Sequence, residues 1–351
     1  MCVRTEPLYR GRMQRAAVIG LGLIGGSIGA GLREAGWVVS GYDSDADHRL
    51  VALDRTLIDE TVDSIDEVVA NAPDIIVIAV SPKATVETLH ALSTDLPIMD
   101  VAGVKQHVLA AAAHLPGFVG THPMAGRETS GPAAASGALF RGASWVVVTG
   151  APPEPTQQAV AVIEALEGRV VRMSAAAHDA AVARISHAPQ LVAGALLAAA
   201  SDVDGALDLA AGSFRDLTRV GASQPLPWVE LLRGNAGDVL DAIVDLKHQL
   251  SRLEAAILTD DDGLLTMLAH ARETRQSLGA PEASVRVALA DQPGEIAKVG
   301  HALESSQVDV RDIQLRHAPH GGGGVLTLSV RPGDEAPLAH ALEEQGLLLV
   351  S

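Results

Sequence analysis

The chain has 351 residues, more than one ordinary hydrophobic core can organise, so the sequence predicts two or three domains. Hydrophobic residues make up 48% and aromatic residues 2% of the chain, which predicts large cores built from aliphatic side chains. A formal net charge of -17 argues against nucleic acid and anionic membrane surfaces as partners, because both attract Lys and Arg. The one cysteine, Cys2, cannot form an internal disulfide or a thiolate metal cluster; it suits a reducing compartment, and no metal site is predicted.

The first residues of the chain are expected to be a flexible extension over 1–13, with Met13 as an alternative start. Arginines followed by the apolar run 16–32 resemble a signal peptide, but six glycines in that run are unfavourable for a signal helix. No other stretch is long and apolar enough to span a bilayer. We therefore expect a cytoplasmic protein that has no membrane partner.

Strands and helices alternate along residues 14–173. Short apolar runs predict strands, and the stretches between them include predicted helices at 25–35 and 104–115. The run 74–80 is continuously apolar, as is typical of a central parallel strand covered on both faces. This order predicts an α/β domain of the Rossmann type, with a doubly wound sheet. The predicted strands are 16–21, 38–42, 74–80, 98–101, 117–120, 145–149 and 169–173.

Residues 174–279 predict an all-α domain. Segments 175–200, 226–258 and 264–278 have helical periodicity, and the stretch 191–200 is apolar on all sides. A lobe of about a hundred residues cannot bury such a helix on every side, so we expect a homodimer formed through this domain.

A third domain is predicted over 284–351, after a Gly-Ala-Pro break at 279–281. The order is strand 285–290, turn 291–294, helix 295–305, strands 308–315 and 325–330, and helix 335–345. This βαββα(β) pattern predicts a small α+β domain of the ferredoxin-like type.

A glycine-rich loop follows the first strand and predicts a dinucleotide site. Residues 20–25, GLGLIG, match the G-x-G-x-x-G pattern in its strand–helix context. Gly20 permits the tight turn, Gly22 lets the backbone approach the pyrophosphate, and Gly25 lets helix and strand pack closely. Asp43, at the end of the second strand, would accept hydrogen bonds from the ribose hydroxyls and repel a 2′-phosphate, which favours NAD over NADP. The predicted cofactor-binding residues are Gly20, Gly22, Leu23, Ile24, Gly25 and Asp43.

Two of the thirteen histidines stand in contexts that suit a general base. His122 lies just past a strand end, where open α/β sheets place their ligands, and His187 opens the helical lobe. Each could instead bond only a loop carbonyl. Arg219 could clamp a carboxylate through two parallel hydrogen bonds; alternatively, Arg215 or Arg219 could form a structural pair with Asp216.

Five motifs, taken in order, resemble the prephenate/arogenate dehydrogenase family of tyrosine biosynthesis. The resemblance covers residues 16 to about 278. The motifs are GLGLIGGSIG at 20–29, DVAGVK at 100–105, GTHPMAGRETSG at 120–131, ISHAPQ at 185–190 and GSFRDLTR at 212–219.

The resemblance implies NAD-dependent oxidative decarboxylation of prephenate to 4-hydroxyphenylpyruvate. It implies that His122 accepts the proton of the 4-hydroxyl, that Arg219 holds a substrate carboxylate and that His187 orients substrate or nicotinamide. Trp228 and Asn235 match positions that line the family's pocket. The terminal domain is similar to an ACT domain, with the turn 291–294 where such modules often bind amino acids, so tyrosine is an expected effector.

Three positions depart from the family pattern. Gly103 stands where the family often has a serine that orients the catalytic histidine, so another donor must serve. Gln190 replaces a second histidine, and Arg127 adds a cation where smaller residues also occur and is a candidate carboxylate contact. These departures leave prephenate or arogenate open as the substrate.

Two further functions compete with this interpretation. A β-hydroxyacid dehydrogenase would rely on a lysine in the helical lobe, where Lys247 is the only lysine between Ser174 and Ala283 and is expected on the surface. A non-catalytic sensor of NAD and amino acids would have no need of His122 together with Arg219.

Overall fold

The computed structural model describes residues 13–126, 129–259, 262–278, 283–317 and 323–350. The predicted extension, apart from Met13, and the candidate contact Arg127 lie outside these residues. Tertiary contacts divide the chain into two compact units, Met1–Lys247 and His248–Ser351. The boundary falls inside helix α11 (Ala236–Leu258).

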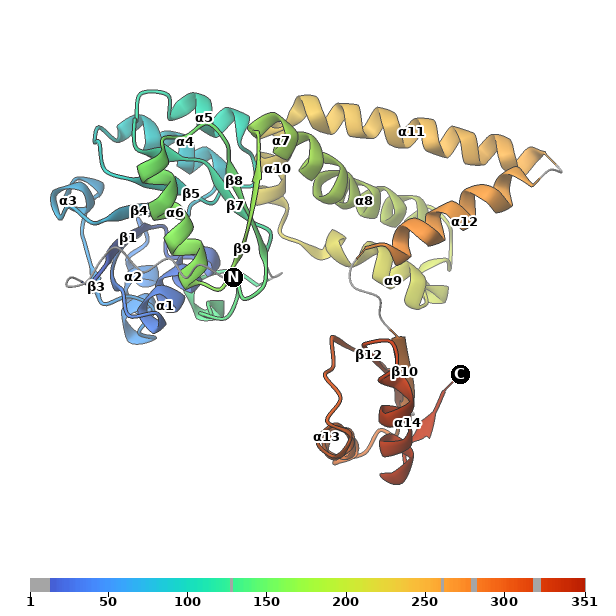
Figure 1. The fold of residues 1–351 in the computed structure, drawn as a ribbon. Helices are drawn as coiled ribbons and strands as arrows, with labels where there is room; N and C mark the ends of the chain where they lie inside the picture. The colour runs from blue at the N-terminus through green and yellow to red at the C-terminus, as the bar shows by residue number, and fades with distance from the viewer. Residues whose placement is uncertain (1–12, 127–128, 260–261, 279–282, 318–322, 351) are drawn as a thin grey trace, which may run out of the picture. The chain divides into compact units, whose positions relative to one another are not determined.

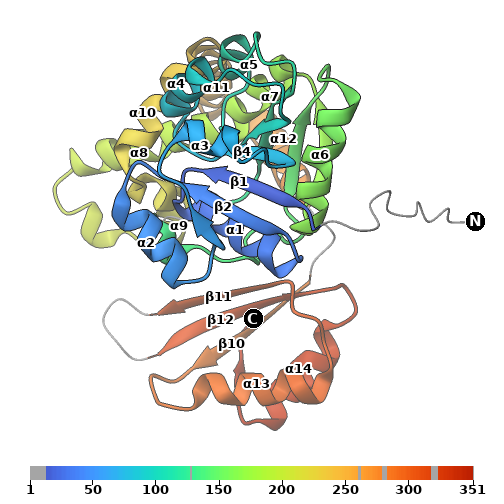
Figure 2. The same cartoon turned by 90° about the vertical axis from the view of Figure 1, so that its left-hand side faces the viewer.

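The first unit is built on a six-stranded sheet in the order β3-β2-β1-β4-β5-β6. Every neighbouring pair runs parallel, as the alternation of strands and helices predicted, so the Rossmann-type sheet is confirmed (Figures 1 and 2). The order reverses between β1 and β4, where sheets of this kind bind ligands at the carboxyl ends of their strands. The strands are β1 Arg15–Ile19, β2 Val38–Tyr42, β3 Glu60–Thr61, β4 Ile75–Ile78, β5 Ile98–Asp100 and β6 Phe118–Val119.

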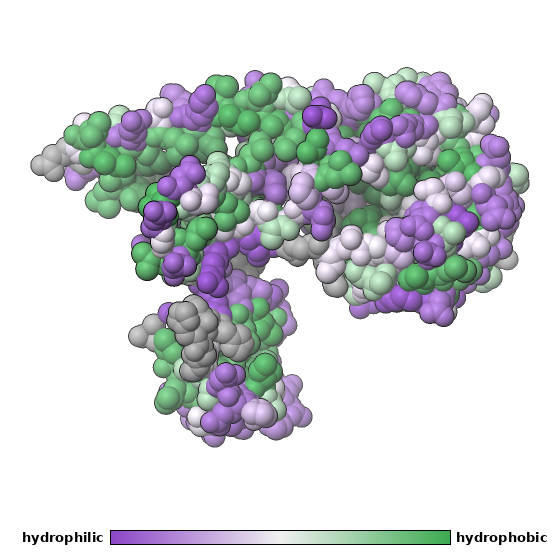
Figure 3. Space-filling view, turned by 180° about the vertical axis from the view of Figure 1, so that it is seen from behind, coloured by the Kyte–Doolittle hydropathy of each residue, from purple (hydrophilic) through white to green (hydrophobic). Residues whose placement is uncertain are grey.

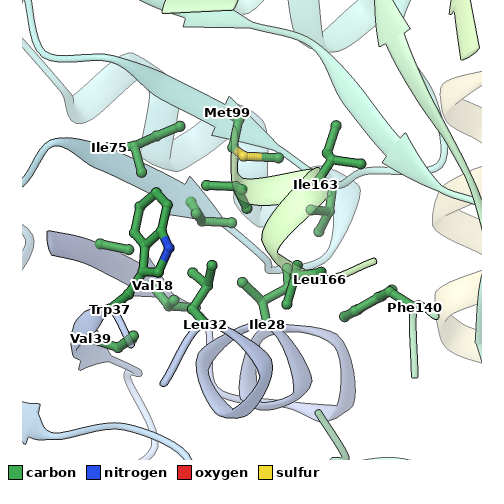
Figure 4. Close-up of a cluster of buried hydrophobic side chains, with 14 of the residues drawn as sticks. Val18, Ile28, Leu32, Trp37, Val39, Ile75, Met99, Phe140, Ile163 and Leu166 are labelled. Atoms are coloured by element: carbon green, nitrogen blue, oxygen red, sulfur yellow. The ribbon is translucent and has the colours of Figure 1, made fainter. Parts of the chain in front are cut away.

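Helices cover both faces of this sheet, because alternate residues of each strand point to opposite sides. Ala16 and Val18 of β1 join one core cluster, with residues from α1 and α6, shown in Figure 4. Ala17 and Ile19 join a second cluster, with residues from α3, α4 and α5. The helices are α1 Leu23–Glu34, α2 Ala46–Asp54, α3 Ile65–Ala70, α4 Pro82–Ala91, α5 Gln106–Ala111 and α6 Pro153–Ala165.

A second, three-stranded sheet follows the parallel one. Its strands β7 (Thr121–Pro123), β8 (Ser144–Val148) and β9 (Arg169–Met173) lie in that order, with β7 antiparallel to β8 and β8 parallel to β9. The sequence predicts β8 and β9 but not β7, which has only three residues.

The helical part begins with α7 (Ala175–Val182), a π-helical turn (Ala183–His187) and α8 (Ala188–Ser201). Helix α9 (Gly212–Thr218) and a 3-10 turn (Arg219–Ala222) follow. The helix predicted over 226–258 is two helices, α10 (Pro225–Gly234) and α11, because the backbone leaves the helical region at Asn235.

Much of the apolar surface in this helical part is not covered within one chain. Only Ala188 and Ala193 of α8 are buried, and Leu240 and Val244 of α11 are more than half exposed. Figure 3 shows hydrophobic surface along α11. Among the described residues, no helix has the length and apolar run needed to cross a membrane.

The second unit contains the end of α11, helix α12 (Gly263–Gln276) and a small α+β fold. The latter has an antiparallel sheet in the order β11-β12-β10-β13, and buried residues of β10 and β12 pack with α13 and α14. The elements occur in the predicted βαββαβ order. They are β10 Ala283–Leu289, α13 Glu295–Ser306, β11 Asp312–His317, β12 Gly324–Val330, α14 Glu335–Glu344 and β13 Leu348–Leu349.

Candidate active site

The glycine loop joins β1 to α1 at the point where the strand order reverses. Gly20 has a φ of 93°, and a Cβ there would lie 2.5 Å from the carbonyl oxygen of Ala79. A Cβ at Gly25 would lie 1.8 Å from the carbonyl oxygen of Gly20, so neither glycine tolerates a side chain. A Cβ at Gly22 would meet nothing within 4 Å. The loop is therefore closely packed at Gly20 and Gly25 but has free space beside Gly22. Because Gly22 lies at the N-terminus of α1, this space suits a pyrophosphate.

Asp43 lies directly after β2 and is tied to the glycine loop. Its carboxylate accepts the backbone N–H of Leu21 at 2.7 Å and the backbone N–H of Asp45 at 2.9 Å. Nδ1 of His48 lies 3.3 Å from the same carboxylate. An ionised carboxylate has about four acceptor positions, so these three contacts still leave capacity for a ribose hydroxyl. Asp43 therefore holds the loop and remains suited to select a cofactor without a 2′-phosphate.

A buried polar cluster fixes the strand that carries His122. Asp100, at the end of β5, accepts the backbone N–H of Thr121 at 3.1 Å and forms an ion pair with Lys105. The ammonium group of Lys105 also donates to the carbonyl oxygen of Thr121 at 2.6 Å, and Trp145 Nε1 donates to Thr121 Oγ1 at 3.0 Å. All four side chains are fully buried. His122 lies just past the end of β6, as expected, and it also lies within the unpredicted strand β7, because this cluster and the pairing with β8 hold that segment extended.

His122 contacts a second histidine that sequence reasoning did not single out. Its Nδ1 lies 2.8 Å from Nε2 of His178, and Nδ1 of His178 lies 2.7 Å from Oδ1 of Asp179. Asp179 also accepts the backbone N–H groups of Lys105 and Gln106, both at 2.8 Å, at the start of α5. The only signal in the sequence is that His178 and Asp179 form a polar pair in an alanine-rich segment.

The other ring nitrogen of His122 faces Gly103. A Cβ built on Gly103 would lie 3.6 Å from Nε2 of His122 and 2.8 Å from Cδ2 of Leu231. Because residue 103 is glycine, it offers no side-chain donor to this nitrogen. His178 bonds the opposite nitrogen, Nδ1.

His187, Trp228 and Asn235 lie together, as the resemblance implied. His187 is buried and ends the π-helical turn, a local distortion that often marks functional sites. Asn235 Nδ2 lies 3.3 Å from Nδ1 of His187 and donates to the carbonyl oxygen of Asp179 at 2.9 Å. The ring of Trp228 stands edge-on to His187, with 6.2 Å between centroids.

Arg219 and Trp228 line a cavity of about 340 Å³, together with Gly126, Thr129 and Gln224. Arg219 starts the 3-10 turn after α9 and is exposed. Gln190, on α8, has a buried Oε1 that finds no hydrogen-bond partner within the described part of the chain. The cavity thus combines a guanidinium group with an aromatic ring, which suits a carboxylate-bearing ring compound.

The electrostatic surroundings favour the neutral form of His122 and of His187. Burial lowers the pKa of His122 well below 6.5, and the neighbouring His178, Lys105 and His187 lower it further, against the opposing effect of Asp179. Burial also lowers the pKa of His187. Burial raises the pKa of the Asp179 carboxyl, but its hydrogen bonds from His178, Gln106 and Lys105 outweigh that effect and lower it overall. His122 is therefore a neutral imidazole that can accept a proton at neutral pH.

The fold and site define a dinucleotide-dependent dehydrogenase with a helical part whose side chains contact His122. Residues 28–175 match the family model described as prephenate dehydrogenase, nucleotide-binding domain. Residues 174–270 match the model described as prephenate dehydrogenase, dimerization domain. The chain belongs to the prephenate dehydrogenase family.

Individual relatives agree with this family. The chain is 30% identical over 341 residues to prephenate dehydrogenase of Bacillus subtilis, covering 90% of this chain and 92% of the relative. It is 33% identical over 279 residues to cyclohexadienyl dehydrogenase of Zymomonas mobilis, covering 74% of this chain and 94% of the relative. Prephenate dehydrogenase from A. aeolicus, solved in complex with hydroxyphenyl propionate and NAD+, superposes with a TM-score of 0.72 at 26% identity, covering 77% of this chain and 100% of that one. Synechocystis arogenate dehydrogenase superposes with a TM-score of 0.67 at 29% identity, covering 76% of this chain and 100% of that one.

Proposed function

We propose that the chain catalyses the NAD-dependent oxidative decarboxylation of prephenate to 4-hydroxyphenylpyruvate in tyrosine biosynthesis. The observation that carries the proposal is His122, whose neutral form is favoured by its surroundings and whose Nε2 lies on the side of Gly103, where no side chain bonds it, in a chain that also has the glycine loop and the cavity of Arg219. Relatives named prephenate dehydrogenase support this substrate. The cyclohexadienyl and arogenate dehydrogenases among the relatives make arogenate the alternative substrate.

The chain's own residues supply the acid–base chemistry and the binding. NAD+, when bound, accepts the hydride from the ring carbon that bears the 4-hydroxyl. His122 Nε2 takes the proton of that hydroxyl as the hydride leaves. The electron pair of the bond to the ring carboxylate then enters the ring, CO₂ departs, and His122 returns the proton to the oxygen of the new phenol. Formation of the aromatic ring makes the step effectively irreversible.

The glycine loop and Asp43 would hold the cofactor. The open side of Gly22 at the start of α1 would face the pyrophosphate, and Leu23 and Ile24 form the first helical residues beside it. The Asp43 carboxylate would accept the ribose hydroxyls and repel a 2′-phosphate, which favours NAD+ over NADP+.

Arg219 would hold a substrate carboxylate before and during the reaction. Replacing Arg219 by alanine should raise the KM for prephenate about 10- to 100-fold and change kcat less, because a charge-assisted hydrogen bond contributes about 1.5–3 kcal/mol. Steady-state kinetics check this prediction. The matched control is Arg215→Ala, since Arg215 lies on α9 directly before the turn that carries Arg219, is exposed and donates to the carbonyl oxygen of Ala210 at 3.1 Å. Equal KM values for both variants would exclude Arg219 as the clamp.

The pH dependence should report the lowered pKa of His122. The neutral imidazole is the active form, so kcat/KM for prephenate should hold its plateau at pH 6.5 and fall only at lower pH, as His122 becomes protonated. A pH–rate profile measures the acid limb. A limb centred above 6.5 would mean that another group, or a histidine in a different environment, acts as the base.

Residues 284–351 would act as an ACT-like regulatory domain that binds tyrosine. Its βαββαβ order supports this role, as does the turn before α13, where Gly294 has a φ of 95°. Gly294→Val would strain that turn, because a β-branched residue is unfavourable at positive φ. We expect tyrosine to inhibit the enzyme and this variant to need at least about tenfold more tyrosine, the equivalent of 1.4 kcal/mol of binding.

The matched control for this prediction is Gly333→Val. Gly333 has a φ of 100° in the turn before α14, and a Cβ at either glycine would meet nothing within 4 Å. Both variants should keep the wild-type kcat without tyrosine, and Gly333→Val should keep wild-type inhibition. Inhibition that competes with prephenate and is equal in all three proteins would place the effector in the active site.

The exposed apolar surface of α8 and α11 would be covered in a homodimer. The family model for residues 174–270 is described as a dimerization domain, which supports this assignment. We also propose the division into 14–173, 174–279 and 284–351. Lys247 is exposed on α11, so it does not supply the lysine that a β-hydroxyacid dehydrogenase would need.

A further inference from the structure

We propose that His178, anchored by Asp179, is a positioning residue that keeps the ring proton of His122 on Nδ1 and leaves Nε2 free as the base. This inference rests on the proposed role of His122. It assigns to two side chains from α7 the orienting function that Gly103 cannot perform.

The first step is the protonation state of His178. Asp179 is buried, and its carboxylate accepts hydrogen bonds from two backbone N–H groups, of Lys105 and Gln106. These bonds favour the ionised carboxylate, which can only accept. Nδ1 of His178 lies 2.7 Å from Oδ1 of this carboxylate and must therefore donate its proton to it.

The second step follows from the first. A neutral His178 with its proton on Nδ1 has a bare Nε2, which acts only as an acceptor. Nδ1 of His122 lies 2.8 Å from that nitrogen and must donate to it. The proton of a neutral His122 then sits on Nδ1, and the lone pair of Nε2 points to the side of Gly103, where the hydroxyl of the substrate is expected.

The third step concerns the charge that forms during the reaction. When His122 accepts a proton at Nε2, it becomes an imidazolium ion in a buried environment close to His178, Lys105 and His187, which all disfavour that charge. The negative charge of Asp179 favours the imidazolium ion and offsets part of this cost, and the hydrogen bond to His178 links His122 to that carboxylate. Asp179 thus orients the imidazole of His122 as a carboxylate orients the histidine of a catalytic triad, except that His178 lies between the two.

Two replacements of His178 separate positioning from packing. His178→Phe preserves the size of the ring but removes the acceptor, and should lower kcat for prephenate about 10²-fold with a KM within about threefold of wild type. His178→Gln can offer its amide oxygen to His122 and its amide N–H to Asp179, and should recover kcat to within about tenfold of wild type. His114→Phe is the control and should leave kcat unchanged, because this exposed histidine, within the described part of the chain, bonds the carbonyl oxygen of Leu92 at 3.1 Å and no group of the site.

Nitrogen NMR measures the tautomer of His122 directly and does not depend on turnover. In ¹⁵N-histidine-labelled wild-type protein, the signal of His122, assigned by its loss in His122→Gln, should show a protonated Nδ1 and a bare Nε2. In His178→Phe, Nδ1 of His122 loses its acceptor, so the share of His122 that carries its proton on Nε2 should rise.

A wild-type His122 protonated on Nε2, or a wild-type kcat in His178→Phe, would overturn the proposal. Should the wild-type protein fail to turn over prephenate, the proposed function would be wrong, and the nitrogen spectrum would still decide the role of His178.

Discussion

Replacing His122 by asparagine should lower kcat for prephenate by about 10²–10⁴-fold, the usual contribution of a general base. Asparagine keeps a similar size and polarity but cannot take up the proton of the 4-hydroxyl. Most substrate binding comes from other groups, so the KM should change by no more than about threefold. Steady-state kinetics with saturating NAD+ measure both constants.

The control for this variant is His114→Asn, which changes a histidine outside the site and should leave kcat unchanged. An unchanged kcat in His122→Asn would mean that His122 is not the base. A raised KM at constant kcat would assign it to substrate binding instead.

Replacing Lys105 by methionine should lower the free energy of unfolding by about 3–5 kcal/mol, because it leaves the buried carboxylate of Asp100 without its partner. The three tryptophans of the chain, Trp37, Trp145 and Trp228, all lie in the first unit. Tryptophan fluorescence during urea denaturation therefore follows the unfolding of the unit that contains Lys105.

An exposed ion pair provides the matched control. Lys83 lies 3.7 Å from Glu87 on α4, with side chains 73% and 66% exposed, so Lys83→Met should cost no more than about 1 kcal/mol. Adding Asp100→Asn to Lys105→Met removes the stranded charge and should recover part of the loss. Equal stability of the two lysine variants would show that the buried pair contributes no more than the exposed one.

Lys105 connects stability with the proposed chemistry. Its ammonium group joins the end of β5 to β7, and its backbone N–H binds the carboxylate of Asp179. The same residue thus fixes the strand that carries His122 and the anchor of the His178–Asp179 pair. The stability of a Lys105 variant should therefore be measured before its activity. Activity would be lost both if β7 were no longer fixed and if Asp179 were no longer anchored.

Local sequence patterns were sufficient to predict the parallel sheet and its glycine loop. Short apolar runs ended by glycine or acidic residues mark β1, β2 and β4, and the spacing from Gly20 to Asp43 places the carboxylate beside the loop. These signals work because a buried parallel strand and a tight turn each restrict the residues at their own positions.

The support of His122 could not be predicted in the same way. His178 lies 56 residues from His122, and Asp179 lies 74 residues from Lys105, so their bonds depend on how α7 packs beside β7 and α5. In sequence, a His-Asp pair in a helix is usually solvated. The break at Asn235 was missed for a related reason, because apolar periodicity continues through it while its amide bonds His187 and Asp179.

The central claim is tested most directly by following NADH formation with purified protein and prephenate. We predict turnover of prephenate with NAD+, and a kcat/KM at least about tenfold lower with NADP+, since repulsion of the 2′-phosphate by Asp43 should cost 1.4 kcal/mol or more. Arogenate in place of prephenate shows which of the two substrates the site prefers. No turnover of either compound with either cofactor would contradict the proposed function.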